Sequence, residues 1–388
     1  MGLAMHFEFA TASRILFGAG RAAELGSLVA GYGRRVLMVV GSSAEQGNAL
    51  LQQLQQEKID TLVFAVHGEP AVPMVENAIA QAREKRCDVV CSVGGGSAID
   101  TGKVVAAMLA NPGDLGDYLE VIGRAQPMQH PAVPFIAVPT TAGTGSEVTR
   151  NAVLASREHR IKVSVRSVTM LPRLALVDPL LTHTMPPAVT ATTGMDALTQ
   201  LIEPYLCSQP SPLVDALVRD SIPRVASSLH RAFNDGQDAE ARENMALASL
   251  FGGLALANAK LGAVHGIAGP FGGMFDAPHG AICARLLPAV LRTTLRALKM
   301  RQPEAPQIKR FDEIAALLTG DPKGKAEQGL EWIERLVEKL DIPRLSEYGF
   351  SDVDMEVLID KSMKASSMKG HPIVLNREDL HGILEQAR

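Results

Sequence analysis

The chain has 388 residues, of which 46% are hydrophobic, 21% charged and only 4% aromatic, and its formal net charge at pH 7 is −4. This composition is typical of a globular protein with an aliphatic core, and it excludes a disordered or fibrous chain. The length predicts two or three domains. The small acidic surplus argues against a nucleic-acid partner, because phosphate binding normally shows as a surplus of basic residues.

Cysteine usage and hydropathy indicate a reducing, aqueous compartment. Cys87, Cys91, Cys207 and Cys283 are too few and too scattered for a disulfide framework, and no second cysteine pair is present to complete a zinc cage. The N-terminal residues contain no apolar signal-peptide segment. The most apolar stretch, 245–259, is shorter than the roughly 20 residues that span a bilayer. We therefore expect a cytoplasmic protein without a membrane partner, in which this stretch forms a buried helix.

Short apolar runs alternate with amphipathic segments in the first half of the chain. Residues 6–17 predict a β-hairpin. The sequence predicts strands over residues 36–40, 61–66, 88–93 and 135–139, helices near residues 45–57, 73–86 and 98–109, and further short strands over residues 150–178. Continuous apolar strands separated by helices are typical of a parallel sheet that helices cover on both faces.

The character of the sequence changes after about residue 181. Strand-like runs disappear, and helical periodicity dominates from residue 187 to the end. The mixed charges of residues 299–340 predict a solvated helical surface. The predicted fold is therefore an α/β Rossmann-like N-terminal domain over residues 1–181, followed by an all-helical C-terminal domain over residues 182–388.

The motif GGGS at residues 94–97 lies directly between a predicted strand and a predicted helix. Glycines allow a ligand to approach the backbone closely, and the N-terminus of the helix favours an anion, so a diphosphate is the expected ligand. The motif is neither G-x-G-x-x-G, because position 99 is Ile, nor a Walker A loop, because Lys103 is misplaced. A tight strand–helix turn without a ligand is the alternative.

A second loop of small and hydroxylated residues, PTTAGTGSEVT at residues 139–149, also follows a predicted strand. Such loops at the carboxyl ends of parallel strands bind ribose and phosphate oxygens. The alternative is a loop whose hydroxyl groups cap its own backbone. The loop is not a G-x-S-x-G nucleophile elbow, which argues against a serine hydrolase.

Four side chains in the second half form a candidate metal site. Asp196 and Gln200 are spaced i, i+4, which places both on one face of a helix. His265 and His279 lie among small and apolar residues beside Gly and Pro. Each residue alone is more often structural than a ligand. Together they offer a carboxylate, an amide oxygen and two imidazoles, which is a donor set for an open Fe(II) or Zn(II) site.

The order of these motifs resembles the iron-containing (group III) alcohol dehydrogenase family. The resemblance rests on GGGSAIDTGK, PTTAGTGSEVT, LALVDPLLT, GMDALTQLIEPY, HGIAGPFGGMFDAPHG and SSMKGHPIVL, which together extend over nearly the whole chain. It implies the two-domain fold that this family shares with dehydroquinate synthase. It also implies NAD(P)-dependent interconversion of an alcohol and an aldehyde or ketone by hydride transfer, with one divalent metal in the interdomain cleft. We further expect a homodimer or larger homo-oligomer.

The resemblance also implies roles for individual residues. Asp196, His265 and His279 match three metal ligands of the family and are the expected catalytic centre, and Gln200 stands at the position of the fourth ligand. The expected cofactor-binding residues follow the strands of the first domain and include one lysine near the ribose: Gly41, Ser42, Gly94, Gly95, Gly96, Ser97, Thr140, Thr141, Thr144 and Lys162.

Two positions depart from the pattern of the family. Gln200 replaces a histidine ligand, which we expect to weaken metal binding, because even changes behind the ligands cost about 10–100-fold in metal affinity or activity. Gly269 replaces a histidine that is thought to help move protons. A proton must then travel by water, a cofactor hydroxyl or another group, and the vacated volume could admit a larger substrate.

The loop after the second predicted strand bears on the choice between NAD and NADP. An acidic residue there normally binds the ribose 2′-OH and repels a 2′-phosphate. This chain has Gly-Ser-Ser at residues 41–43, without a carboxylate, which favours NADP. Arg157, Arg160 and Lys162 form a basic cluster that would help to bind the phosphate, with a solvated hairpin as the alternative.

Three other functions stay open on the sequence. A metal-independent reductase of an oxo acid, similar to maleylacetate reductases, would use His265 or His279 to orient the substrate carbonyl. A lyase similar to dehydroquinate synthase would use NAD only transiently. A nucleotide-binding protein without catalysis would bind a pyridine dinucleotide but turn over no carbonyl substrate.

Overall fold

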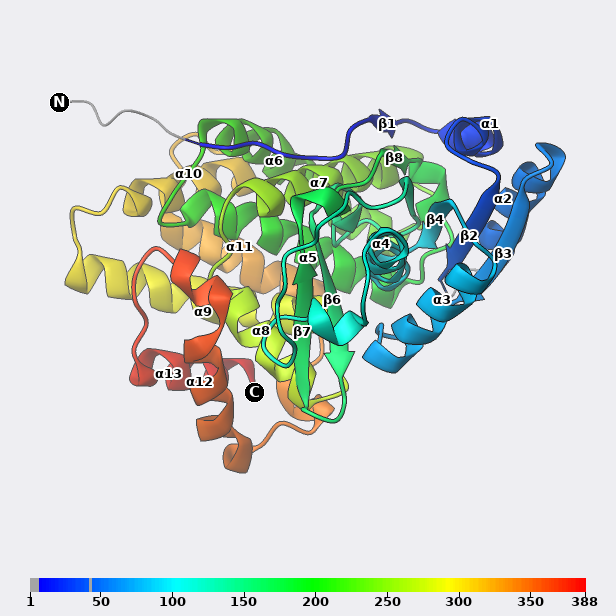
Figure 1. Cartoon of the computed structure of the whole chain (residues 1–388). Coiled ribbons are helices and arrows are strands. Elements are labelled where there is room, and N and C mark those ends of the chain that lie inside the picture. Colours follow the sequence, from blue (N-terminus) through cyan, green and yellow to red (C-terminus); the bar gives the residue numbers. More distant parts are fainter. Residues whose placement is uncertain (1–6, 42–43) are drawn as a thin grey trace.

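The computed structural model describes residues 7–41 and 44–388. It has an N-terminal part built around a parallel sheet and a C-terminal part built from helices, which confirms the predicted α/β and all-helical fold. Figure 1 shows the sheet at the right of the view and the helical part at the left, with the hairpin of β6 (Asn151–Ser156) and β7 (Ile161–Arg166) between them.

Within the described residues, the main sheet has the strand order β1-β8-β5-β4-β2-β3, and every pairing in it is parallel. Its strands are β1 (Ile15–Phe17), β2 (Arg35–Val40), β3 (Asp60–Ala65), β4 (Val89–Gly94), β5 (Phe135–Pro139) and β8 (Leu174–Val177). A separate antiparallel pair consists of β6 (Asn151–Ser156) and β7 (Ile161–Arg166). The predicted strands over residues 36–40, 61–66, 88–93 and 135–139 are confirmed within one residue at either end.

The predicted hairpin over residues 6–17 is wrong for the part of it that the structure describes. Residues 7–14 are not in a strand, and β1 pairs in parallel with β8 rather than with a neighbouring segment of its own. Ile15, Leu16 and Phe17 lie beside Ala175, Leu176 and Val177. The apolar alternation near the N-terminus reflects pairing with a strand more than 150 residues away, which local periodicity does not reveal.

Helices cover both faces of the sheet because side chains alternate along each strand. Val36 and Met38 of β2 pack under α1 and α2, whereas Leu37 and Val39 pack under α3 and α4. The helices are α1 (Leu25–Ala30), α2 (Ala44–Gln56), α3 (Val72–Glu84) and α4 (Gly96–Ala110).

The C-terminal part is helical from α5 to the end of the chain. Its helices are α5 (Pro187–Leu206), α6 (Pro212–Asn234), α7 (Ala239–Asn258), α8 (Ala263–Met274), α9 (His279–Arg301), α10 (Gln307–Thr319), α11 (Ala326–Lys339), α12 (Met355–Lys364) and α13 (Arg377–Ala387). The last strand of the sheet ends at Val177, so the predicted domain boundary at residue 181 falls in the connection to α5 and stays a prediction.

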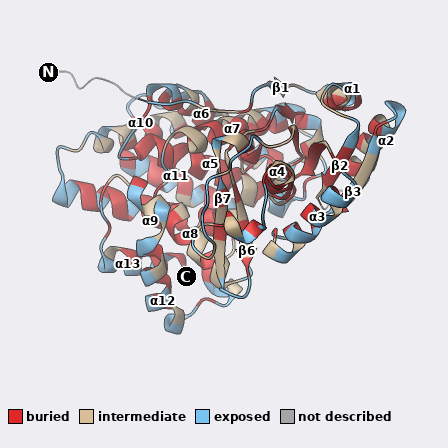
Figure 2. Cartoon of the chain, viewed as in Figure 1, coloured by how far each residue is buried: buried red, intermediate tan, exposed pale blue. Residues whose placement is uncertain are grey.

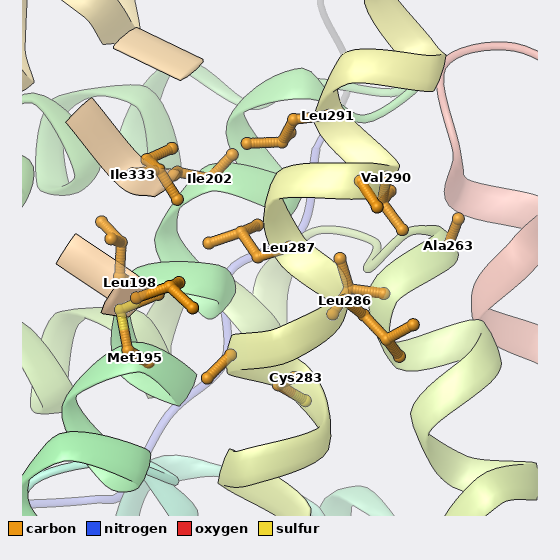
Figure 3. Close-up of a cluster of buried hydrophobic side chains, with 14 of the residues drawn as sticks. Met195, Leu198, Ile202, Ala263, Cys283, Leu286, Leu287, Val290, Leu291 and Ile333 are labelled. Carbon is orange, nitrogen blue, oxygen red and sulfur yellow. The ribbon is translucent and has the colours of Figure 1, made fainter. Parts of the chain in front are cut away.

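Buried residues gather in the middle of the molecule, along α4, α5 and α7, while exposed residues lie on outer helices such as α2 and α12 (Figure 2). Figure 3 shows one face of α9 packed on α5, with Cys283 at one end of the drawn cluster. The expected buried helix over residues 245–259 is α7, although its last residues, 256–259, are only partly buried. In the described chain, no single helix is both long and apolar enough to cross a membrane; α7 and α8 meet that test only when joined across a bend of 95°.

Candidate active site

Helices α5, α8 and α9 bring the predicted metal ligands together. Asp196 lies in the middle of α5, His265 in the first turn of α8, and His279 is the first residue of α9. The Oδ1 atom of Asp196 lies 3.5 Å from Nε2 of His265 and 3.9 Å from Nε2 of His279. Residues from three separate helices therefore present their donor atoms to a single point.

Three buried atoms of these helices lack hydrogen-bond partners in the described part of the chain: Asp196 Oδ1 and His265 Nε2 at this point, and Gln200 Oε1 one turn further along α5. The Gln200 amide donates to the other carboxylate oxygen of Asp196 at 3.0 Å, which leaves these three atoms unused. A buried polar atom without a partner costs about 1–3 kcal/mol. A divalent cation would satisfy Asp196 Oδ1 and His265 Nε2, which lie 3.5 Å apart, so the residues present fit a metal site.

Glu203 orients the His265 ring from behind. One oxygen of Glu203 accepts the Nδ1–H of His265 at 2.6 Å, and the other accepts the backbone N–H of Val264 at 2.7 Å. Because Nδ1 donates to Glu203, Nε2 is the ring nitrogen that faces Asp196. A carboxylate behind a metal-binding imidazole is the usual arrangement in metal sites, where it fixes the ring and raises its basicity.

His371 anchors the same end of α8. Its Nδ1 accepts the N–H of Ala263 at 3.1 Å, and its Nε2 lies 2.9 Å from the hydroxyl of Thr294. The first N–H groups of a helix have no partner within the helix. His371 and Glu203 therefore satisfy two successive N–H groups at the start of α8 and hold His265 in place.

The two carboxylates and the histidines shift one another's pKa. Burial raises the pKa of Asp196 and of Glu203, but hydrogen bonds and charge from the histidines outweigh it, so both pKa values fall below the ordinary range. Burial lowers the pKa of His265, yet its bonds to Asp196 and Glu203 raise it to about 10. Burial lowers the pKa of His279 to about 4. Protonated His265 supplies the positive charge between the two carboxylates at neutral pH, and a cation bound at Nε2 would replace that proton.

The predicted phosphate loop lies at the carboxyl edge of the sheet. Gly41 follows β2, and its N–H donates to the carbonyl of Val93 at 2.9 Å, while a Cβ at Gly41 would lie 3.3 Å from Cα of Gly94. The strand order reverses between β2 and β4. In open parallel sheets, nucleotides bind in the crevice at such a reversal. Ser42 lies outside the described residues.

The second predicted loop touches the first. The N–H of Thr140 donates to the carbonyl of Gly94 at 3.0 Å. A Cβ at Gly95 would lie 3.2 Å from the Thr141 side chain, and one at Gly96 would lie 2.9 Å from that of Thr144. The loops after β4 and β5 therefore pack directly against each other beside Ser97 in the first turn of α4, and a side chain at Gly95 or Gly96 would force a threonine to shift.

Buried Lys103 has a structural role that explains its position in the motif. Its Nζ donates to Ser146 Oγ and Thr149 Oγ1, both at 2.9 Å, and to the carbonyl of Asn151 at 2.7 Å. It therefore ties α4 to the second loop instead of reaching a phosphate, as the absence of a Walker A pattern predicts.

The second loop also reaches the helix that carries Asp196. A Cβ at Gly143 would lie 2.5 Å from the Cβ of Thr193, which precedes Asp196 on α5, and one at Gly145 would lie 2.3 Å from Cα of Gly253 on α7. The predicted dinucleotide surface and the carboxylate–histidine cluster thus adjoin, because α5 belongs to both.

Lys162 of β7 faces α8. Its Nζ pairs with Glu69 Oε1 at 2.5 Å and lies 2.7 Å from the position of a Cβ on Gly272. Arg157 and Arg160 are exposed in the turn between β6 and β7, where Arg160 donates to the carbonyl of Met274. Only Lys162 of this basic cluster is thus enclosed, and the two arginines lie in a solvated hairpin, the alternative that the sequence left open.

Gly269 lies one turn after His265 on α8 with open space beside it. A Cβ at this position would meet nothing within 4 Å, whereas one at Gly266 would lie 2.8 Å from the Met368 side chain. The position that departs from the family pattern therefore borders a space that side chains leave free.

Three residues of the site were not predicted. Glu203 follows Asp196 by seven positions, two helical turns on the same face, and Cys283 follows His279 by four, so helical spacing could have indicated both. His371 offers no such signal, because it reaches the site through a contact more than 100 residues away in sequence.

Burial, together with the negative charge of Asp196 and Glu203, raises the pKa of the Cys283 thiol.

Comparison with known proteins agrees with this arrangement. Residues 12–179 match the family model for iron-containing alcohol dehydrogenase, and residues 190–388 match that for the C-terminal part of the Fe-containing alcohol dehydrogenase family. The fold and site define a two-domain oxidoreductase. The chain belongs to the iron-containing alcohol dehydrogenase family.

Similar relatives carry several activities. The chain is 35% identical to 1,3-propanediol dehydrogenase of Klebsiella pneumoniae over 367 residues, 92% of either chain. It is 32% identical to choline dehydrogenase of Bacillus subtilis, over 98% of this chain and 94% of that one. A crystal structure of 1,3-propanediol oxidoreductase superimposes with a TM-score of 0.91 at 33% identity, covering 99% of this chain and 100% of the other. The chain is an alcohol dehydrogenase-type oxidoreductase by family.

Proposed function

We propose that this protein interconverts a small alcohol and its aldehyde or ketone, using NAD or NADP and a divalent metal held by Asp196, His265, His279 and Gln200. One observation carries the proposal. Two unpartnered buried atoms, Asp196 Oδ1 and His265 Nε2, lie 3.5 Å apart, and α5, which carries Asp196, also contacts the loop after β5; this supports a cation site beside a dinucleotide surface.

Each group in the site has a distinct task. The chemistry supplied by a bound metal is polarisation of the substrate oxygen, and that of the nicotinamide is hydride exchange. Asp196 contributes the negative charge that holds the cation, and Glu203 keeps the His265 lone pair directed at it. The glycines at residues 94–96 allow the diphosphate to approach the backbone at the start of α4.

Residue 269 is glycine, so this position offers no side chain that could exchange a proton with the substrate. His279 stays about one-third exposed, and its pKa of about 4 keeps it neutral near pH 7. We therefore propose that protons leave through water in the open space beside Gly269, and that this space also accepts substrates larger than a three-carbon diol.

Cofactor choice depends on the loop after β2. Residues 41–43 carry no carboxylate to repel a 2′-phosphate, which favours NADP, and Ser42 and Ser43 are outside the described residues. A similar structure, sulfoacetaldehyde reductase from Bifidobacterium kashiwanohense at 27% identity, was solved with NAD+. We propose that the protein uses both cofactors, with NADPH preferred.

The test is NADH and NADPH oxidation against a panel of aldehydes, ketones and oxo acids, on protein whose metal content has been measured. We expect turnover that chelation with EDTA abolishes and that Fe(II) or Zn(II) restores. Full activity after complete metal removal would instead support the oxo-acid reductase similar to maleylacetate reductases.

Two other outcomes identify the remaining alternatives. If the protein binds the dinucleotide and consumes an oxygenated cyclic substrate without net oxidation of NADH or NADPH, the result would support the lyase. If it binds the dinucleotide and consumes no substrate, the result would support a binding protein. The homo-oligomer and the cytoplasmic location stay predictions, which sedimentation of purified protein and cell fractionation would test.

A further inference from the structure

The fourth donor atom at the candidate metal site is a sulfur. Atoms of Asp196, His265, His279 and Cys283 all lie within 4.8 Å of one another, and Cys283 Sγ lies 3.5 Å from Nε2 of His279. Cys283 is fully buried one helical turn after His279 on α9. It therefore faces the same point as the unpartnered atoms of Asp196 and His265.

We propose that the Cys283 thiolate is a protein ligand of the metal and makes this site prefer Zn(II) over Fe(II). The inference rests on the proposed metal centre and adds a ligand that compensates for the histidine missing at Gln200. On metal binding, the sulfur–hydrogen bond breaks, the proton passes to solvent, and the sulfur lone pair forms the bond to the metal; nothing is oxidised or reduced.

The spacing of the donor atoms fits a tetrahedral ion. Metal–ligand distances of about 2.0–2.3 Å place ligand atoms roughly 3.3–3.8 Å apart in a tetrahedron. The observed separations are 3.5 Å from Asp196 to His265, 3.9 Å from Asp196 to His279 and 3.5 Å from His279 to Cys283. All four donor atoms lie within 4.8 Å of one another, so small side-chain shifts would bring them to these separations around one ion.

The charge and the softness of the thiolate also favour Cys283 as a ligand of Zn(II). One carboxylate and one thiolate neutralise a divalent ion, and the two imidazoles add neutral donors. Thiolate is a soft ligand that favours Zn(II) over Fe(II), whereas the amide oxygen of Gln200 is a hard and neutral donor. A purely structural cysteine would explain the place of Cys283 in the buried cluster (Figure 3), but not the unpartnered atoms of Asp196 and His265, two residues whose donor atoms lie within 4.8 Å of its sulfur.

Metal-depleted full-length protein reconstituted with Co(II) or Zn(II) provides the test. We expect a near-ultraviolet sulfur-to-cobalt charge-transfer band and, by X-ray absorption, a zinc–sulfur shell at about 2.3 Å. Cys283→Ala and Cys283→Ser should lose both signals and lower the Zn(II)-to-Fe(II) affinity ratio about tenfold or more. Cys91→Ala, which removes an equally buried sulfur in β4, should retain both signals.

The outcomes for the cysteine ligand and for the dehydrogenase activity are distinguishable. Metal uptake without a sulfur signal in the wild type, or with unchanged signals in both Cys283 variants, would overturn the cysteine ligand and leave the dehydrogenase proposal intact. Failure of the wild type to bind any metal would overturn both. Circular dichroism and thermal unfolding establish that each variant is folded before its metal spectrum is compared.

Discussion

Glu203 and His265 form a 2.6 Å hydrogen bond between side chains that are only 4% and 7% exposed, directly behind the candidate metal site. The bond determines which imidazole nitrogen faces Asp196 and the candidate metal site. The second oxygen of Glu203 also holds the N–H of Val264, so one carboxylate on α5 positions both the ring and the helix that carries it.

Replacing Glu203 by Gln tests this arrangement. The amide keeps one oxygen acceptor but loses the charge that favours the Nδ1–H tautomer. We expect metal affinity and kcat/KM to fall about 10–100-fold. Competition titration with a zinc chelator measures the metal affinity, and steady-state kinetics measure kcat/KM. Glu334→Gln, on the surface of α11, is the control, and equal effects in the two variants would contradict the positioning role.

Acid should destabilise the protein through His371. Burial lowers its folded-state pKa to about 4, against the partly opposing charges of Glu203 and Asp379. The unfolded chain therefore binds more protons between about pH 6.5 and pH 4, and the stability that neutral His371 contributes above this range is lost as the pH falls through it.

His371→Asn should flatten this dependence. Asparagine can still accept the N–H of Ala263 but does not titrate. Urea unfolding at several pH values should give a smaller drop in the free energy of unfolding between about pH 6.5 and pH 4 for the variant than for the wild type. If the free energy of unfolding falls equally with pH in the variant and in the wild type, His371 does not titrate in this way.

Gly253→Ala should separate the second loop from α7. A Cβ at this position would lie 2.4 Å from the carbonyl oxygen of Gly145, and Gly145 cannot move freely because its φ is +59°. Overpacking of this kind costs about 1–3 kcal/mol. We expect lower stability and weaker dinucleotide binding by calorimetry. Gly382→Ala in α13, where nothing lies within 4 Å, should stabilise the helix by about 1 kcal/mol or less.

Gly269 should control substrate size. A methyl group fits the open space, so Gly269→Ala should retain kcat/KM for small aldehydes. Gly269→Leu should fill the space and lower kcat/KM for branched substrates about tenfold relative to propanal, since a methylene or two in a pocket is worth about 1–3 kcal/mol. An unchanged ratio across the panel would show that substrates do not use this space.

Local patterns in the chain were enough to locate most strands and helices and the two glycine-containing loops, because these depend on short-range periodicity and on glycines beside strands. They also made Asp196 and Gln200 neighbours, because one helical turn separates the two residues. The N-terminal hairpin was predicted wrongly, since β1 pairs with β8 at the other end of the domain.

Packing between distant segments settled which groups meet at the site. The convergence of α5, α8 and α9 placed Glu203 behind His265, His371 on the N–H of Ala263, and Cys283 beside His279. No local pattern encodes such contacts, because they depend on how buried helix faces pack against one another and on which polar atoms that packing leaves without partners.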